Sequence, residues 1–262
     1  MNPVESKILE AAKILRDAQA NKKLCNPIRE IIGADNIEAA YAIQNLNTNL
    51  KLESGAQIIG KKIGLTSKVV QEQFGIDEPD FGMLWNDTEV ENGGSIAVNE
   101  ILQPRAEAEL AFILKQDLNS ENLTSLDVLM SIEYVLSSIE IVGSRIKNWD
   151  IRIADTIADN ASASHWVIGH QPRKIHQVDI LNCKMSMTKN GELVSSGIGS
   201  NCLGSPINAT LWLAKQMAKL GQPLKAGELI LSGAVGPMVA ISAGDTFHCS
   251  IEGLGDVSCS FE

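Results

Sequence analysis

The chain has 262 residues, with 22 Lys and Arg against 32 Asp and Glu, which gives a formal net charge of −10. Hydrophobic residues make up 44% of the sequence, a typical globular composition in a chain long enough to bury a sizeable core. The acidic balance argues against a nucleic-acid or anionic-membrane binder, because such partners require a basic surface.

The five cysteines are scattered and include no CxxC pair, which rules out a zinc ribbon or a thioredoxin-like redox site. This spacing is typical of a reducing compartment, where buried thiols behave as small apolar residues. The first residues lack the apolar segment of a signal peptide, and no apolar run approaches the roughly 20 residues of a membrane helix. We therefore expect a cytoplasmic protein that binds neither membranes nor nucleic acids.

The first 55 residues are predicted to be helical. Apolar residues between Val4 and Leu15 recur at helical spacing. A second helix is expected to begin near Asp35, because Glu38 follows three residues later, as in a capping box.

The middle of the chain changes between extended and helical character. Thr124, with Asp127 three residues later, predicts the start of a helix. The elements expected in this part are strands at 57–63, 107–114 and 138–143, and helices at 66–74 and 124–137.

The last third is predicted to consist mostly of strands. Asn190 and Gly191 predict a hairpin turn, and Ser205 before Pro206 predicts the start of a helix that ends before Gly221. Further strands are expected at 228–232, 238–242, 246–251 and 257–261. Helices first and strands later indicate an α+β fold, and the absence of repeats and linkers favours a single domain over 1–262.

One predicted strand carries two acidic residues on the same face. Side chains alternate along a strand, so Glu107 and Glu109 share one face, while Ala108 and Leu110 share the other. Carboxylates about 7 Å apart repel each other unless a positive charge lies between them, and a divalent cation supplies such a charge. A solvated strand face explains the pattern equally well.

Glu140 lies in an apolar segment, where a buried unpaired charge is very costly. It is expected to lie at an exposed edge, to pair with Arg145, or to join Glu107 and Glu109. Three carboxylates together form a hard oxygen site that selects Mg²⁺ or Mn²⁺ and leaves about three positions for water or substrate. Such an ion can hold a 2-oxo acid through its carboxylate and keto oxygens.

Two further candidates have weaker signals. Lys62 lies in an extended segment between Gly60 and Gly64, where a ligand can approach closely, although surface lysines are the commoner outcome. Asp80 is by default a turn residue. The chain has no Walker A, GxSxG or HExxH motif, and its glycines do not form a GxGxxG motif in a βαβ context.

Taken together, the motifs resemble the 2-keto-4-pentenoate hydratase family, within the fumarylacetoacetate hydrolase superfamily. No single motif is decisive, but their common order along nearly the whole chain makes chance similarity implausible. The segments that carry the resemblance are 35–44, 62–66, 79–82, 103–109, 140–145, 158–162, 195–197, 202–204 and 233–238.

The resemblance assigns a role to each candidate residue. Three acidic residues are implied as ligands of Mg²⁺ or Mn²⁺: Glu107, Glu109 and Glu140. Two residues are implied as catalytic, Lys62 and Asp80, and two as substrate-binding, Leu65 and Ser162.

The implied fold is a fumarylacetoacetate-hydrolase-like mixed β-sheet and β-roll core over 56–262, with a helical N-terminal region over 1–55. The implied reaction is the metal-dependent hydration of 2-hydroxypenta-2,4-dienoate (2-oxopent-4-enoate) to 4-hydroxy-2-oxopentanoate by a homo-oligomer. The metal is expected to stabilise an enolate, and Lys62 to transfer a proton with a pKa lowered beside the metal. Asp80 is expected to orient or deprotonate the water.

Two other functions stay open. A decarboxylase of 2-oxohex-3-enedioate (4-oxalocrotonate) needs the same enolate and, in addition, a basic residue for the second carboxylate of its substrate. A non-catalytic subunit that associates with a pathway enzyme is the other alternative, and the intact set of acidic residues with Lys62 argues against it.

Overall fold

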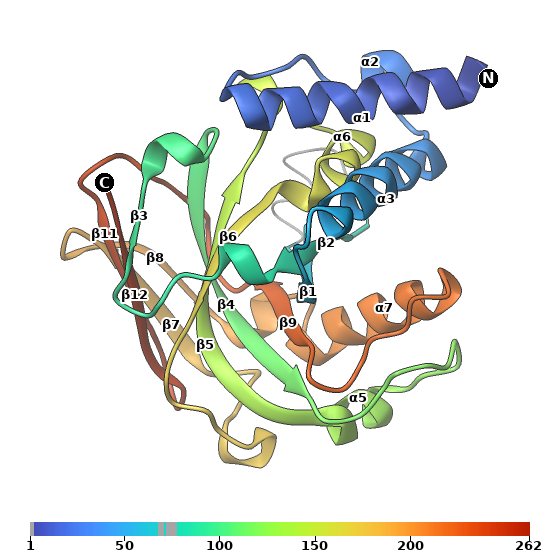
Figure 1. The fold of residues 1–262 in the computed structure, drawn as a ribbon. Coiled ribbons are helices and arrows are strands. Elements are labelled where there is room, and N and C mark those ends of the chain that lie inside the picture. The colour runs from blue at the N-terminus through green and yellow to red at the C-terminus, as the bar shows by residue number, and fades with distance from the viewer. Residues whose placement is uncertain (1–2, 68–70, 72–77) are drawn as a thin grey trace.

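The computed structural model describes residues 3–67, 71 and 78–262. These residues form two β-sheets, with α1, α3 and α6 together at one end of the larger sheet and the smaller sheet beside it (Figure 1). Within the described residues, no helix has both the length and the apolar character needed to cross a bilayer.

The N-terminal region is helical, as predicted. Its helices are α1 (Pro3–Asn21), α2 (Arg29–Ile32) and α3 (Ile37–Glu53). The expected cap of the long second helix is displaced by one residue, because the Asn36 side chain accepts the backbone N–H of Ala39. The single turn of α2 was not predicted, since four residues are too few to show a helical period.

The larger sheet is mixed, with the strand order β2-β1-β9-β4-β5-β6, and β10 pairs with β4. Strands β1 and β9 run parallel, and the other neighbours in this sheet run antiparallel. Its strands are β1 (Ile58–Gly64), β2 (Asp80–Trp85), β4 (Pro104–Leu114), β5 (Ile132–Gly143), β6 (Ala163–Ile168), β9 (Leu229–Ala234) and β10 (Val239–Ala240).

The smaller sheet has the strand order β3-β12-β11-β7-β8. The predicted hairpin joins β7 to β8 through Asn190 and Gly191. The strands of this sheet are β3 (Ser95–Ile96), β7 (Lys184–Lys189), β8 (Glu192–Ile198), β11 (Thr246–Ile251) and β12 (Gly255–Phe261).

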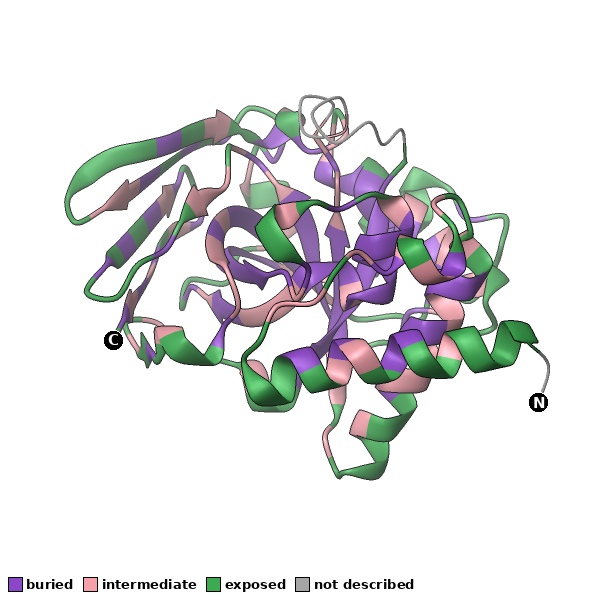
Figure 2. Ribbon diagram, turned by 90° about the horizontal axis from the view of Figure 1, so that it is seen from above, coloured by how far each residue is buried: buried purple, intermediate pink, exposed green. Residues whose placement is uncertain are grey.

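The main core lies on the face of the larger sheet that the smaller sheet and the helix over 206–219 cover, and the strands at the centre of Figure 2 are largely buried. One face of β4 supplies Ala108, Leu110 and Phe112, and the smaller sheet supplies Phe247 and Phe261. Because side chains alternate along β4, the acidic residues of this strand lie on the opposite face, which points away from the smaller sheet. The apolar face therefore fixes the direction in which the glutamates point.

The predicted helix over 124–137 is wrong in its second half. The capping box of Thr124 and Asp127 is present, but α5 (Ser125–Ser131) ends early and β5 begins at Ile132. The segment after residue 131 pairs with β4 along nearly its whole length, and these tertiary hydrogen bonds override the local helical signal.

The remaining predictions concern two helices and the cysteines. Helix α7 (Pro206–Lys219) begins as predicted, with the Ser205 side chain accepting the N–H of Ile207. The short helix expected from Thr66 or Ser67 to Phe74 lies mostly outside the described residues. All five cysteines are free thiols, and four of them are buried.

Candidate active site

Three carboxylates lie close together on the face of the larger sheet that points away from the smaller sheet. The register of β4 and β5 places Glu107 directly opposite Glu140, and Glu109 lies two residues further along β4. One oxygen from each carboxylate lies within 4.8 Å of the others. Arg145, the alternative partner of Glu140, instead forms an ion pair with Asp159. The structure thus brings the three predicted acidic residues together.

The negative charge of the three carboxylates is opposed by one nearby cation, Lys62. Burial raises the pKa of Glu140 to about 7, against the opposing effect of Lys62. Burial, followed by the Glu140 charge, raises the pKa of Glu109 well above its ordinary value. Among the described residues, Glu109 Oε1 and Glu140 Oε2 have no hydrogen-bond partner, while Glu140 Oε1 is paired with the Lys62 ammonium group. Buried oxygens without donors fit a hard divalent cation such as Mg²⁺ or Mn²⁺.

Lys62 comes from β1 and is buried, with 2% of its surface exposed. Its Nζ lies 3.2 Å from Glu140 Oε1 and donates a hydrogen bond of 2.9 Å to the carbonyl oxygen of Ala161. Burial acts to lower the pKa of Lys62, but Glu140 and then Asp80 raise it above its ordinary value. The predicted lowering applies to Lys62 beside a bound metal ion and stays a prediction, because here the carboxylates around the ammonium group carry no metal charge.

Asp80 is the first residue of β2 and is almost fully buried, so it is not the turn residue that its local sequence suggests. Its Oδ2 accepts a 2.8 Å hydrogen bond from Thr156 Oγ1, whereas Oδ1 has no donor among the described residues. A Cβ at Gly64 would lie 2.1 Å from Asp80 Oδ1, so only glycine leaves room for this carboxylate. Burial raises the pKa of Asp80, opposed by Lys62 and Thr156.

A strained turn completes the site. Helix α6 (Ile153–Ala158) is followed by the 3-10 turn η4 (Asn160–Ser162), and Asn160, Ala161 and Ser162 have φ values of 55°, 50° and 56°. Left-handed backbone costs roughly 1–2 kcal/mol for each residue other than glycine. Such a conformation persists only where the surrounding structure holds it in place.

The Asn160 side chain holds this turn against β2. Its Oδ1 accepts the backbone N–H of Met83 at 2.8 Å, and its Nδ2 donates to the carbonyl oxygen of Met83 at 3.1 Å. Gly82 permits this contact, since a Cβ there would lie 2.2 Å from the Asn160 carbonyl oxygen. The Ala161 carbonyl of this turn accepts the hydrogen bond from Lys62, and Ser162 is part of the lining of the cleft.

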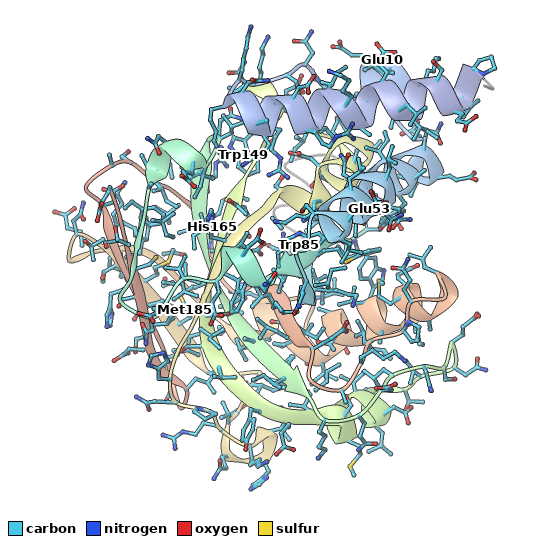
Figure 3. The ribbon with its side chains drawn as sticks, in the orientation of Figure 1. Glu10, Glu53, Trp85, Trp149, His165 and Met185 are labelled. Atoms are coloured by element: carbon cyan, nitrogen blue, oxygen red, sulfur yellow. The ribbon has the colours of Figure 1, made fainter. Side chains whose placement is uncertain are left out.

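A cleft of about 40 Å³ opens beside these groups. Five of the seven predicted site residues line it, while the other two, Glu109 and Glu140, lie buried behind Glu107. Trp149 forms another part of the wall and is labelled in Figure 3. The lining residues are Lys62, Gly64, Leu65, Asp80, Glu107, Val142, Trp149, Ile151, Thr156, Ala161, Ser162 and Met238.

The sequence interpretation assigned no role to Thr156 or Asn160. Both lie in the polar run 155–162, in which the resemblance assigned a role to Ser162 alone. Their roles depend on hydrogen-bond partners in β2 that are distant in the sequence. The sequence therefore offered only one indication of these two residues, the high density of polar groups in the run 155–162.

The chain is similar to known proteins over nearly its whole length. The fumarylacetoacetate (FAA) hydrolase C-terminal family matches residues 57–262. A protein named TodF product hydratase, from Pseudomonas putida, is 48% identical and covers 97% of this chain and 95% of its own. The 2-keto-4-pentenoate hydratase of Paraburkholderia xenovorans is 47% identical, with coverages of 97% and 94%.

A solved structure is also similar over nearly the whole chain. The 4-oxalocrotonate decarboxylase from Pseudomonas putida G7, complexed with magnesium and adipate, has a TM-score of 0.94. It is 29% identical, with 98% of each chain covered. These comparisons confirm the expected α+β fold and the expected family. The chain belongs to the fumarylacetoacetate hydrolase family and, within it, to the group of the 2-keto-4-pentenoate hydratases.

Proposed function

We propose that the chain is a hydro-lyase that adds water to 2-hydroxypenta-2,4-dienoate (2-oxopent-4-enoate) and forms 4-hydroxy-2-oxopentanoate. The observation that carries this proposal is the convergence of three carboxylates, within 4.8 Å, beside a cleft lined by Lys62 and Asp80. The hydratase names of relatives at 47–48% identity over nearly the full length support this reaction in the degradation of aromatic compounds by meta-cleavage.

Glu107, Glu109 and Glu140 are the proposed ligands of Mg²⁺ or Mn²⁺. The buried oxygens without hydrogen-bond donors support this assignment, as does the magnesium in the structure of the related decarboxylase. When bound, the ion polarises the substrate carboxylate and 2-oxo group and stabilises negative charge on the 2-oxygen.

Lys62 and Asp80 are the proposed proton-transfer groups. The Lys62 ammonium, held between Glu140 and the Ala161 carbonyl, is positioned to donate a proton to C5 of the dienol. The proton of the C2 hydroxyl group is released to solvent as the α,β-unsaturated ketone forms. The raised pKa of Asp80 makes its carboxylate a stronger base toward the water that adds at C4, and its Oδ1 has no donor among the described residues.

Leu65 and Ser162 are the proposed substrate-binding residues. Both line the cleft, and the buried Ser162 hydroxyl has no hydrogen-bond partner among the described residues. We propose that this hydroxyl binds a polar substrate atom, while Leu65 packs against the apolar chain.

The direct test is an assay of the purified chain with Mn²⁺ and 2-hydroxypenta-2,4-dienoate, which follows the loss of dienol absorbance and the appearance of 4-hydroxy-2-oxopentanoate. Turnover by the chain alone is expected. Absence of turnover both with Mn²⁺ and in a parallel assay with Mg²⁺ would instead favour the non-catalytic subunit. We further propose that the chain forms a homo-oligomer and associates with an enzyme of the same pathway. Light scattering of the same sample tests the first proposal, and addition of a candidate pathway enzyme tests the second.

A decarboxylase of 4-oxalocrotonate is the second candidate, and the TM-score of 0.94 with such an enzyme favours it. However, Lys62 is the single basic residue among the described residues of the cleft wall, and a second substrate carboxylate needs a further cation. The same chain incubated with 4-oxalocrotonate is therefore expected to release no CO₂. Release of CO₂ faster than hydration would reverse the assignment.

A further inference from the structure

Arg105 is a cation beside the active-site cleft to which the proposed reaction gives no role. It lies on β4 and, because side chains alternate along a strand, it shares the face of Glu107 and Glu109. It is half-buried and forms no ion pair with any described residue. Burial lowers its pKa, against the opposing effect of Glu107. The guanidinium group has therefore lost water without gaining a carboxylate partner.

The indole ring of Trp149 fixes the position of this guanidinium group. Arg105 Cζ lies 4.5 Å from the centroid of the ring, a distance at which a cation and an aromatic face attract each other. The ring is itself held, because Trp149 Nε1 donates a 3.1 Å hydrogen bond to the carbonyl oxygen of Gln103. Trp149 lines the cleft, so the cation is held next to it. A stacked guanidinium group keeps its N–H donors in its own plane, where they can bind a carboxylate.

Met238 lies between this cation and the cleft. Its side chain is part of the cleft lining, whereas Arg105 is not. Arg105 Nη1 donates to Met238 Sδ at 3.3 Å, the one hydrogen bond that this guanidinium group makes to a described residue. A thioether sulfur is a weak acceptor, so the contact compensates little of the charge. Met238 therefore shields from the cleft a cation that would bind a carboxylate far more strongly.

The position of Arg105 matches the far end of a dicarboxylate. Arg105 and Glu107, a proposed metal ligand, are two residues apart on one face of β4, which is about 7 Å. Ala240 of β10 pairs with Arg105, and Met238 precedes it by two residues, so Met238 lies near the level of Glu107. A six-carbon chain with a carboxylate at each end spans this distance. With its first carboxylate at the metal, its second would meet Met238 before it could reach Arg105.

We propose that Met238 determines the substrate specificity of the site, because it shields Arg105 and so excludes 2-oxo dicarboxylates. This inference rests on the proposed function, in which the substrate carries a single carboxylate and binds through it at the metal. Beside Met238 the cleft is lined by the apolar side chains of Val142, Trp149 and Ile151, which suit the uncharged end of 2-hydroxypenta-2,4-dienoate. A side chain too short to reach Arg105 opens the cation to the cleft.

The test compares adipate with hexanoate by calorimetry on the full chain loaded with Mn²⁺. Both probes have six carbons and lack the dienol that reacts, and they differ in the second carboxylate. The wild type should bind adipate at most about two-fold more tightly, the factor that two equivalent carboxylates give. Met238→Ala should bind adipate at least about ten-fold more tightly than hexanoate, because charge-assisted hydrogen bonds to Arg105 become possible. Arg105→Gln in the Met238→Ala background should abolish this preference.

Two control variants separate shielding from general effects. Met238→Leu keeps the bulk of the side chain and should show no preference for adipate. Met130→Ala removes a methionine of α5 that is 58% exposed and lies outside the cleft lining, and it should bind both probes as the wild type does.

The proposal is overturned if Met238→Ala binds neither probe, if it shows no preference for adipate, or if the preference persists without Arg105. If Met238→Ala does not fold, Met238→Thr gives the same comparison with the same outcomes. Hydration of 2-hydroxypenta-2,4-dienoate by the wild type tests the proposed function separately. Failure of that assay together with an adipate preference in Met238→Ala would overturn the reaction and support the shielding of Arg105.

Discussion

The carboxylates of Glu107, Glu109 and Glu140 lie closer together than like charges tolerate without compensation, since one oxygen of each lies within 4.8 Å of the others. Their oxygens that lack donors remain a cost to the metal-free fold. A cation that occupies this position therefore contributes to stability as well as to chemistry.

Replacing Glu107 by Gln tests this dependence at one residue. Gln keeps the size of the side chain but removes the negative charge that a divalent cation requires. We expect Mn²⁺ affinity and hydration rate to fall together, the rate by at least about 100-fold, because a lost metal removes several kcal/mol of transition-state stabilisation.

Calorimetry with Mn²⁺ and steady-state kinetics measure the two losses. The matched control is Glu121→Gln, at an exposed glutamate remote from the site, which should leave both values unchanged. Wild-type turnover in Glu107→Gln, or full activity of the wild type after exhaustive chelation, would rule out the metal site.

The raised pKa of Glu140 predicts how stability depends on pH. The pKa rises from 4.5 to about 7 on folding, so the folded metal-free chain holds a proton that the unfolded chain releases in this interval. This contribution to stability is complete below pH 4.5 and is lost as the pH rises through about 7. A cation needs the ionised carboxylate, so its stabilising effect should increase over the same range.

Thermal unfolding with and without Mn²⁺ at pH 5.5 and pH 8 measures this effect. At 100 times its Kd the ion adds about 2.7 kcal/mol, which corresponds to a rise in Tm of roughly 5–10 °C at pH 8. At pH 5.5 the rise should be smaller. An equal or larger rise at pH 5.5 would contradict the prediction, and Glu140→Gln should remove the difference between the two pH values.

Among the elements, the turn η4 connects the helical region to the active-site cleft. Its three left-handed residues are held by the paired hydrogen bonds between Asn160 and Met83. The turn in turn supplies the carbonyl group that accepts a hydrogen bond from Lys62. The position of Lys62 therefore depends on the hydrogen bonds between Asn160 and Met83, and neither of these residues lines the cleft.

Asn160→Ala removes both hydrogen bonds between the side chain of residue 160 and the backbone of Met83. We expect kcat to fall about ten-fold, because Lys62 loses its fixed position, while Mn²⁺ affinity stays near the wild-type value. Asn160→Asp keeps the acceptor for the Met83 N–H and should recover part of the rate. A parallel loss of Mn²⁺ affinity and kcat in Asn160→Ala, or no difference between the two variants, would show that the residue acts only on general stability.

At the scale of the whole molecule, the core between the sheets fixes β4, and β4 orients the metal-binding face. Leu110 is fully buried in this core and lies on the opposite face of β4 from Glu109. The core therefore stabilises β4 from the face opposite to the one that carries the acidic residues.

Leu110→Ala is expected to lower the free energy of unfolding by about 3 kcal/mol, as large-to-small substitutions in cores do. Urea unfolding measures this loss, and Leu126→Ala, at a leucine that is 64% exposed, serves as the matched control. A loss below about 1 kcal/mol for Leu110→Ala would show that this core does not hold the strand.

The division into a helical region over 1–55 and a β-rich core over 56–262 that act as one catalytic domain stays a prediction. The helices α1 and α3 and the boundary near β1 agree with it in their positions along the chain. A test of the domain organisation requires expression of 56–262 alone and comparison of its unfolding with that of the full chain.

The sequence by itself determined the features that depend on near neighbours. The faces of β4 follow from the alternation of Glu107 to Glu109 with apolar residues, the hairpin follows from Asn190 and Gly191, and the caps follow from Thr124 and Ser205. Strand alternation and the cost of a buried lone charge also singled out Glu107, Glu109 and Glu140 as a candidate set. The resemblance to a known family added the roles of the other site residues, Lys62, Asp80, Leu65 and Ser162.

Only the tertiary structure decided what depends on strand pairing and burial. The register of β4 with β5 brings Glu140 to Glu107, and the helix expected beyond residue 131 becomes a strand. The surrounding carboxylates raise the pKa of Lys62 in the metal-free chain. These outcomes depend on contacts between distant segments. A local pattern carries no information about the charge or the dielectric environment that such contacts create.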